Sequence, residues 1–257
     1  MEFPTPHHIR ELGLEALPVR PDARAKLGGN PGFLTDRIRP GQLRAAILGS
    51  PHPHARILSI DTSAAQALPG VHAVVTHADI PGIKHYGLRK VDRPVLCIDK
   101  VRHVGDPVAA VAAVDMETAR QALALIRVEY EPLPPVCDPV AALDGTAASD
   151  QPVHQGGNLL HAASHRQGDM SAARASTVHR VQDSYVTPRQ MHAFLETEGG
   201  VAEPDGAGGL QLFFGGHNPA RDKQVIADML GLPHDRVHAV GTPVGGSYGG
   251  KDELTIQ

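Results

Sequence analysis

The residues best placed to do chemistry gather in the stretch PVGGSYGGKDELTIQ, residues 243–257. Glycines allow a backbone to approach a phosphate, a cofactor or another strand closely. Gly245, Gly250 and Lys251 have the G-x4-G-K spacing of a phosphate-binding loop, but Asp252 stands where Ser or Thr would bind magnesium. Such a loop also needs a following helix, and the few residues after Lys251 are too short for one that is stable alone. A nucleoside triphosphate site is therefore disfavoured.

Histidines are the second candidate group, and the sequence holds 16 of them. The pairs His7-His8 and His52/His54 could bind metal, but no third or fourth ligand has the spacing of a closed zinc site. Prolines beside His52 and His54 favour an extended turn over a strand. His192 is expected to be a hydrogen-bonded interior histidine in a strand.

Three other side chains could be nucleophiles. Ser247 lies in the Gly-rich turn, but the sequence has no G-x-S-x-G elbow and identifies no base for it, which disfavours a serine hydrolase. Cys97 and Cys137 form no CxxC pair and are expected to be reduced, mostly buried thiols. Two cysteines cannot supply the four thiolates of an iron–sulfur cluster.

Length and charge limit the class of protein. A chain of 257 residues predicts one large or two medium domains. The net charge is −4 with both signs mixed and no basic stripe, so nucleic acid is not an expected partner. Residues 1–26 contain no apolar run that would suit a signal peptide or a membrane span, so we expect a cytoplasmic protein.

Alternating strands and helices over about residues 30–140 predict a first α+β unit. Asp115 is expected to cap a helix over 116–126, and Ser63 and Gln66 have capping-box spacing for a short helix that ends at Pro69-Gly70. The expected strands cover 42–50, 55–60, 71–80, two short pieces of 99–115 separated at Gly105-Asp106-Pro107, and 127–134.

A second unit contains the clearest predicted helix, with Asn218 at the N-cap, Pro219 at the first turn and Gly231 after the last turn. Long strands are predicted over 176–205 with a kink near Pro188. Further strands are expected at 209–216 and 235–243. The predicted organisation is an N-terminal arm (1–29), a first domain (30–140), a linker (141–169) and a second domain (170–257).

The order of several motifs carries a more specific signal. GQLRAAILGSPHPHARILSIDTSAAQALPGVHAVVTHADIPG (41–82) resembles the opening of the a/b hammerhead domain of the xanthine dehydrogenase and aldehyde oxidase family. RPVLCIDKVRHVGDPVAAVAA and VEYEPLPPVCDPVAAL resemble later parts of that domain. RQMHAFLET is similar to the family's Q-x-H-x-x-L-E, and VGGSYGGKDE to its G-G-G-F-G-G-K-E. The resemblance extends over about Asp22 to Asp252.

The resemblance implies an α+β fold, with a hammerhead domain followed by the first part of a molybdopterin-binding domain. It also implies a molybdenum-pterin cofactor and hydroxylation of an aldehyde or an N-heterocycle with oxygen from water. Gly246, Ser247, Tyr248 and Gly249 would line that cofactor. His217 takes the place of the family's glutamine near the molybdenum, and the shorter Asp252 replaces a substrate-contacting glutamate.

The family's molybdenum subunit normally continues for several hundred residues, so the resemblance implies no catalytic residue in this chain. Glu196, Glu198 and Glu253 do not match the motif of the family's general base. We expect a second molybdopterin-binding chain to supply that base, as in the divided subunit of nicotinate dehydrogenase. Iron–sulfur clusters and FAD would lie on further subunits. The alternatives are a non-catalytic assembly or scaffold relative and an inert truncated product.

Overall fold

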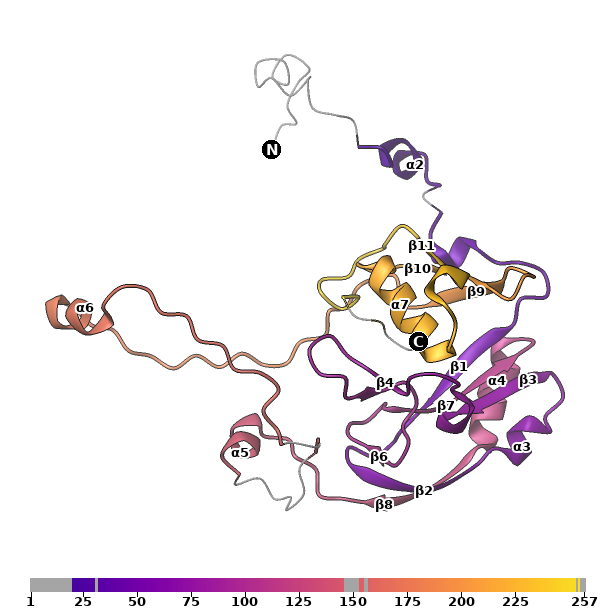
Figure 1. Cartoon of the computed structure of the whole chain (residues 1–257), viewed down its shortest axis with the longest axis horizontal. Coiled ribbons are helices and arrows are strands. Elements are labelled where there is room, and N and C mark those ends of the chain that lie inside the picture. Colours follow the sequence, from indigo (N-terminus) through magenta and orange to yellow (C-terminus); the bar gives the residue numbers. More distant parts are fainter. Residues whose placement is uncertain (1–19, 31, 146–152, 155–156, 253, 255–257) are drawn as a thin grey trace, which may run out of the picture.

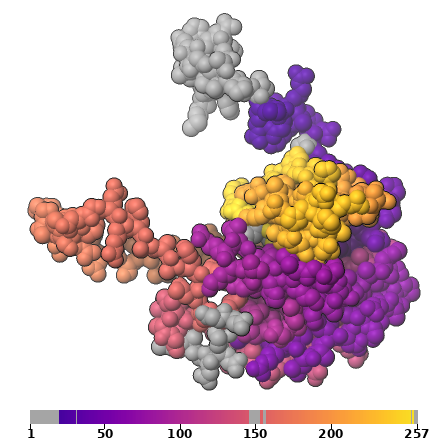
Figure 2. All heavy atoms as spheres, viewed as in Figure 1, coloured from indigo at the N-terminus to yellow at the C-terminus, as the bar shows by residue number. Residues whose placement is uncertain are grey.

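The computed structural model describes residues 20–30, 32–145, 153–154, 157–252 and 254. The predictions for His7-His8, for most of the N-terminal arm and for Glu253 lie outside these residues. The chain forms two mixed helix and strand units, and the second sits directly on the first (Figures 1 and 2). The predicted α+β fold class is confirmed.

A three-stranded antiparallel sheet with β7 in the centre forms half of the first unit. Helix α4 packs on this sheet and α3 packs beside α4 (Figure 1). Small side chains such as Ala109, Ala113 and Ala122 fill the layer between them and are fully buried, which lets the helix approach the sheet closely. The elements are β1 (Arg44–Gly49), β3 (Val71–Thr76), β7 (Pro107–Ala113), α3 (Ser63–Gln66) and α4 (Met116–Leu125).

A second antiparallel sheet, in the order β6-β2-β8, encloses a smaller core around Cys97 and Val101. Burial raises the pKa of the Cys97 thiol to about 12, so this thiol is unreactive at neutral pH. Cys137 is exposed, because it follows the last strand, outside both cores, and the prediction of two mostly buried thiols is wrong for it. The elements are β2 (Ala55–Asp61), β6 (Lys100–Val101), β8 (Arg127–Pro132) and the β4 (His85–Tyr86) and β5 (Arg93–Pro94) ribbon.

The helix starts of the first unit follow the predictions in part. Asp115 caps α4, because its carboxylate accepts a hydrogen bond from the Thr118 N–H at 2.7 Å. The predicted capping box of Ser63 and Gln66 is wrong. Ser63 is the first helical residue, and the Asp61 carboxylate accepts a hydrogen bond from the Ser63 N–H at 3.0 Å. Helix α5 (Pro139–Asp144) is not among the predicted elements, although Asp138 caps it in the usual way.

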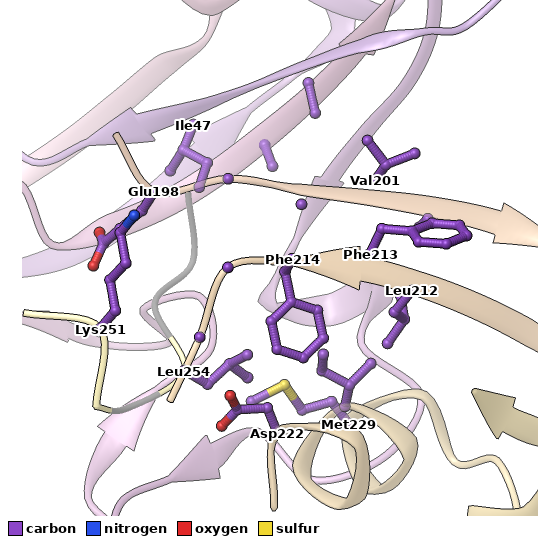
Figure 3. Close-up of a pocket in the computed structure, with 18 of the residues that line it drawn as sticks. Ile47, Glu198, Val201, Leu212, Phe213, Phe214, Asp222, Met229, Lys251 and Leu254 are labelled. Atoms are coloured by element: carbon purple, nitrogen blue, oxygen red, sulfur yellow. The ribbon is translucent and has the colours of Figure 1, made fainter. Parts of the chain in front are cut away.

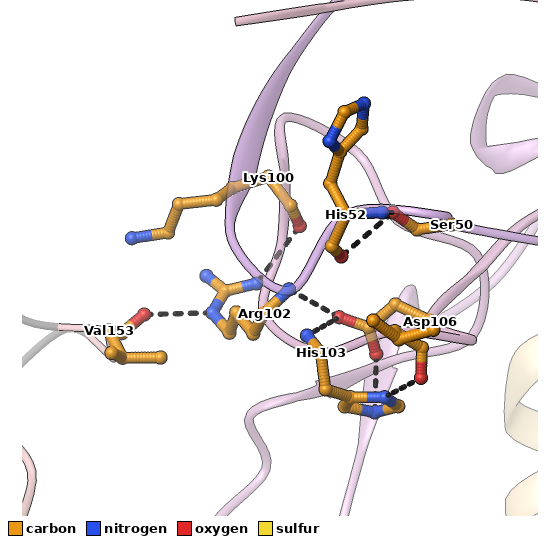
Figure 4. Close-up of polar contacts among 8 residues, drawn as sticks. Ser50, His52, Lys100, Arg102, His103, Asp106 and Val153 are labelled. Carbon is orange, nitrogen blue, oxygen red and sulfur yellow. Dashed lines mark hydrogen bonds and ion pairs between the residues drawn. The ribbon is translucent and has the colours of Figure 1, made fainter. Parts of the chain in front are cut away.

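The turn before β7 is fixed by one buried carboxylate (Figure 4). Asp106 accepts hydrogen bonds from the N–H groups of Arg102 and His103, and its other oxygen lies 2.7 Å from His103 Nε2. Burial alone would raise the pKa of Asp106, but these hydrogen bonds outweigh it and lower the pKa. The side-chain hydrogen bond to Asp106 raises the pKa of His103. The N–H and C=O of Ser50 bond to the same turn, at 2.8 Å each, and tie it to β1.

In the second unit, β10 (Leu210–Phe214) is central, pairing antiparallel with β9 (Gly200–Pro204) and parallel with β11 (Val237–Gly241). Helix α7 (Pro219–Leu230) connects β10 to β11 and packs on them. Its predicted caps are confirmed: Asn218 accepts from the Arg221 N–H at 3.1 Å, and Gly231 is left-handed with φ 63°. A parallel pair of strands needs such a crossover connection. Helix α7 therefore determines where the loops that follow β10 and β11 lie.

The predicted long strands over 176–205 are wrong except for β9. After α6 (Met170–Ser176), residues 177–193 have no regular secondary structure and are exposed. Within the described residues no strand lies beside them to accept their backbone hydrogen bonds, and a strand is not stable without such a neighbour. For the same reason His192 is exposed and lies outside any strand, so its predicted interior position is wrong.

The two units are joined by backbone as well as side-chain contacts. The N–H groups of Gly82 and Ile83 donate to Met229 and Asp228 carbonyls at the end of α7, at 2.9 and 3.0 Å. A Cβ at Gly82 would lie 1.8 Å from the Asp228 carbonyl oxygen, so only glycine permits this approach. Arg37 lies over the Phe213 ring at 4.1 Å. These contacts hold β10 and α7 in place against the first unit.

Candidate functional site

The Gly-rich loop forms a tight turn, closed by a 2.8 Å hydrogen bond from the Gly250 N–H to the Ser247 carbonyl. Its two central residues, Tyr248 and Gly249, have positive φ values of 51° and 89°. Such values are uncommon for an aromatic residue and cost of order 1–3 kcal/mol. The Tyr248 side chain is mostly exposed. In the described part of the chain, the N–H groups of Tyr248 and Gly249 make no hydrogen bond.

A buried ion pair supports this turn. Lys251 Nζ lies 3.0 Å from Glu196 Oε2, which also accepts a hydrogen bond from the Gly245 N–H at 2.8 Å. The ammonium group lies 4.8 Å from the centre of the Phe194 ring. Only 3% of Lys251 is exposed, so it cannot bind a phosphate in the way a phosphate-loop lysine does. This geometry contradicts the nucleoside triphosphate alternative.

The glycines of the loop have two different roles. A Cβ at Gly245 would lie 2.6 Å from the Glu196 Cβ, and one at Gly250 would lie 2.5 Å from Phe194 Cε1. These two glycines therefore permit close packing on residues 194–196. A Cβ at Gly249 would meet nothing within 4 Å. Gly249 thus presents bare backbone to open space, where another group can approach its N–H.

The structure brings together two of the predicted site residues, His217 and Asp252. The His217 Nδ1 pairs with an Asp252 carboxylate oxygen, and the backbone N–H of His217 donates to the Lys251 carbonyl at 3.2 Å. The Arg221 guanidinium also donates to the Asp252 carbonyl. The side chains of His217 and Asp252 are about half exposed. His217 follows β10 and precedes the α7 cap, so the sheet and helix of the second unit place it beside the Gly-rich loop.

A cavity of about 660 Å³ lies between the first unit and the β9–β10 sheet (Figure 3). Its lining is mostly apolar, with Phe214 and Met229 on the side of α7, and Lys251 and Leu254 border it. Asp222, 3% exposed, is a charged group in its wall. Burial raises the pKa of Asp222 although the Arg221 guanidinium opposes this shift; the guanidinium lies 3.6 Å from Asp222 Oδ1, an ion pair too long for a hydrogen bond. The sequence did not indicate Asp222 as a site residue, because it lies in a polar stretch of α7 that carries no sign of its burial.

The remaining predicted side chains lie elsewhere. The Ser247 hydroxyl is buried and accepts from the Lys251 N–H at 3.1 Å. His54 is buried with its Nδ1 2.7 Å from the Pro134 carbonyl oxygen, while the His52 ring meets Tyr130 edge-on. Among the described residues, no three His, Cys, Asp or Glu side chains come together as metal ligands.

The helices among those residues include none with the length and apolar character needed to cross a membrane.

Two family models match the chain. Residues 28–134 match the a/b hammerhead domain of aldehyde oxidase and xanthine dehydrogenase, and residues 153–257 match the molybdopterin cofactor-binding domain. Gly249, His217 and Asp252 therefore lie within the second of these regions.

Curated relatives and solved structures agree with these matches. The chain is 44% identical to a probable xanthine dehydrogenase subunit of Bacillus subtilis (strain 168), over 93% of this chain and 32% of that protein. It is 37% identical to the nicotinate dehydrogenase large molybdopterin subunit of Eubacterium barkeri, over 93% of this chain and 56% of that subunit. The crystal structure of quinoline 2-oxidoreductase from Pseudomonas putida 86 superposes with a TM-score of 0.78 and 31% identity, over 91% of this chain and 31% of that chain.

The chain thus spans about a third to a half of the length of these relatives. Its hammerhead match precedes its molybdopterin-binding match, as the order of the sequence motifs predicts. The chain shares the fold of molybdenum hydroxylases. The chain belongs to the aldehyde oxidase and xanthine dehydrogenase family.

Proposed function

We propose that this chain is part of a molybdenum-dependent hydroxylase and forms one wall of its molybdopterin site. The observation that carries the proposal is the turn at Tyr248 and Gly249. Its backbone is held in a left-handed conformation, its N–H groups are free of partners within the described residues, and Gly249 faces open space. Left-handed backbone with free N–H groups is suited to bind an anionic or oxo ligand.

Each site residue has a role in this proposal. The Tyr248 and Gly249 N–H groups would hold the oxygen side of the cofactor, which supplies the redox centre when it is bound. The His217 Nδ1–H would donate to the Asp252 carboxylate, which leaves Nε2 of the neutral ring as an acceptor facing the site. Asp252 would fix the His217 ring and border the substrate. Gly246 and Ser247 would shape the turn, since Ser247 bonds to Lys251 and Gly246 has φ 104°.

The proposal places the general base on the portion of the relatives that this chain does not span. Glu196 is engaged by Lys251 and the Gly245 N–H, so its Oε2 is not free to take a proton from substrate. We infer that a second molybdopterin-binding polypeptide supplies the base. Iron–sulfur clusters would belong to other subunits, because the two cysteines of this chain are too few to hold a cluster, and FAD would belong to a further subunit.

We favour an N-heterocycle over an aldehyde as substrate. The relatives named above are described as acting on xanthine, nicotinate and quinoline, which are N-heterocycles. The Asp252 carboxylate can accept a hydrogen bond from a ring N–H of such a substrate.

Replacement of Gly249 by Val tests the site. The complex that contains this chain would be purified from its native source through a tag on this chain, and its molybdenum, pterin and turnover would be measured. Gly249→Val introduces a side chain at φ 89° that points to the proposed cofactor, so we expect assembly to persist with loss of most molybdenum and of turnover.

Gly206→Val is the matched control, because Gly206 has φ 74°, is equally uncrowded and lies in the β9–β10 turn. It should keep the molybdenum content and the turnover. Full cofactor content and activity in Gly249→Val would refute the proposed site. A wild-type complex without molybdenum would refute the proposed function and favour the scaffold alternative.

A further inference from the structure

Residues 177–193, named here the exposed segment, extend away from both units in Figures 1 and 2. Five large apolar side chains of this segment are 86–95% exposed: Val178, Val181, Tyr185, Val186 and Met191. Apolar exposure of this kind in a short stretch marks a surface that another protein covers.

The backbone of the exposed segment also has no neighbouring strand among the described residues. Among the described residues, positions 178–193 form no backbone–backbone hydrogen bond. Yet Val181, Tyr185 and Val186 are residue types that favour strands, and the sequence predicts a strand over this stretch. A strand needs a neighbouring strand. A segment that favours a strand but has no such neighbour among the described residues is suited to join a sheet of another polypeptide.

The exposed segment leads directly into residues that pack against the Gly-rich loop. Phe194 and Glu196, which follow it, pack against Gly250 and Gly245 and pair with Lys251. A polypeptide that binds the exposed segment is therefore brought next to Gly249.

The greater length of the relatives supports one candidate for that polypeptide. The superposed quinoline 2-oxidoreductase leaves less than a tenth of this chain uncovered, and this chain spans only 31% of it. Residues 157–195 that project from the body are longer than that uncovered part, so some of them have a counterpart inside a longer chain. The remaining length of the relatives is thus available to cover this surface.

We infer that residues 178–187 form a strand by pairing with the polypeptide that supplies the remaining molybdopterin-binding portion. Val181 and Tyr185 would face one side of the sheet, and Val178 and Val186 the other, so the partner would cover apolar side chains on both faces. Pro188, which has no N–H, would end the pairing. This inference rests on the proposed function, because its partner is the chain that completes the cofactor site.

Photocrosslinking in the native complex tests the inference. p-Benzoylphenylalanine would be placed at position 181, or at position 140 in α5 as a control, since Val140 is also exposed but lies in a short helix. Mass spectrometry would then identify the crosslinked peptides. We expect position 181, and not position 140, to crosslink to a polypeptide with a molybdopterin-binding sequence. Crosslinks to a second copy of this chain, to an iron–sulfur or flavin subunit, or to nothing would overturn the inference.

Val181→Pro tests the strand itself. The isolated chain should keep its stability, because Val181 makes no backbone hydrogen bond there. Assembly should weaken by about tenfold, from the loss of one ladder hydrogen bond. Ala163→Pro, outside the proposed strand, should assemble normally. Unchanged assembly of Val181→Pro in a complex that retains molybdenum would refute the strand and leave the proposed function intact. A wild-type complex without molybdenum would refute both.

Discussion

The first and second units differ in how far they complete their own structure. The sheets of the hammerhead unit find their partner strands within residues 44–132, and its buried Asp106 accepts from backbone and from His103. In the second unit, residues 178–193 form no backbone–backbone hydrogen bond within the described part of the chain. Buried side-chain atoms without a hydrogen-bond partner occur in both units, for example His54 Nε2 in the first and Glu196 Oε1 in the second, so the difference between the units lies in the backbone.

This difference is physically informative because a segment whose sequence favours a strand needs a neighbouring strand for its backbone hydrogen bonds. The exposed apolar side chains of residues 178–191 lie in the second unit, and so do the N–H groups of Tyr248 and Gly249, which make no hydrogen bond in the described part of the chain. They point to groups supplied by another part of the assembly, while the hammerhead unit should behave as a domain that is stable by itself.

The buried pair beneath the loop should show the largest effect. Lys251→Ala leaves Glu196 buried without its cation, and we expect a loss of about 3 to 5 kcal/mol in the free energy of unfolding. Chemical denaturation monitored by circular dichroism would measure it. The paired Glu196→Leu and Lys251→Met variant, which leaves no buried charge, should recover most of the loss. A loss below about 1 kcal/mol for Lys251→Ala would show that the pair does not support the loop.

In the hammerhead unit, Asp106→Ala should cost about 2 to 3 kcal/mol, since two N–H donors and His103 lose their acceptor. The loss should be the same in the isolated chain and in the complex, because this turn is complete within the chain. Asp106→Asn keeps one acceptor oxygen and should lose less. A larger loss in the complex would contradict the view that this unit is closed.

Asp222→Asn should stabilise the isolated chain by about 1 kcal/mol at pH 7. Burial raises the pKa of Asp222 above 3.8, so the folded state holds the proton more tightly and wild-type stability falls as pH rises through that raised pKa. The gain in the variant should therefore vanish below about pH 3.8. In the complex the gain should disappear or reverse, if a donor from the partner pairs with Asp222. A gain independent of pH would contradict the role of the buried charge.

The smallest effect concerns His103, whose side chain is 69% exposed. Its pKa is raised by Asp106, so its contribution to stability is complete below pH 6.5 and is lost as pH rises through the raised folded value. His103→Gln should cost about 0.5 kcal/mol at pH 6 and less at pH 9. Thermal melts at both pH values would measure this, and an equal cost at both would exclude the ion pair as its cause.

Local signals predicted much of the fold. The caps Asp115 and Asn218 and the stop at Gly231 are short-range chemistry, which the sequence displays directly. Helix α5 could have been found the same way, from Asp138-Pro139. The strands over 176–199 could not be judged from sequence, because strand propensity says nothing about whether a neighbour is present in the same chain.

The candidate site was predictable as a set of residues but not as a geometry. The Gly-rich loop and His217 were identified from motifs in the sequence. The contact of Glu196 with Lys251, 55 positions apart, and the burial of Asp222 depend on tertiary packing and have no local signature. The pairing of His217 with Asp252 likewise arises only because α7 returns the chain beside β10.

Amide hydrogen exchange, compared between the isolated chain and the native complex, tests the central claim most directly. We predict that amides of residues 178–187 and of the Tyr248–Gly249 turn exchange rapidly in the isolated chain and become strongly protected in the complex, while those of β7 and α4 are protected equally in both. Equal exchange of the second unit in both states would contradict the claim that this unit is completed by another part of a molybdenum hydroxylase.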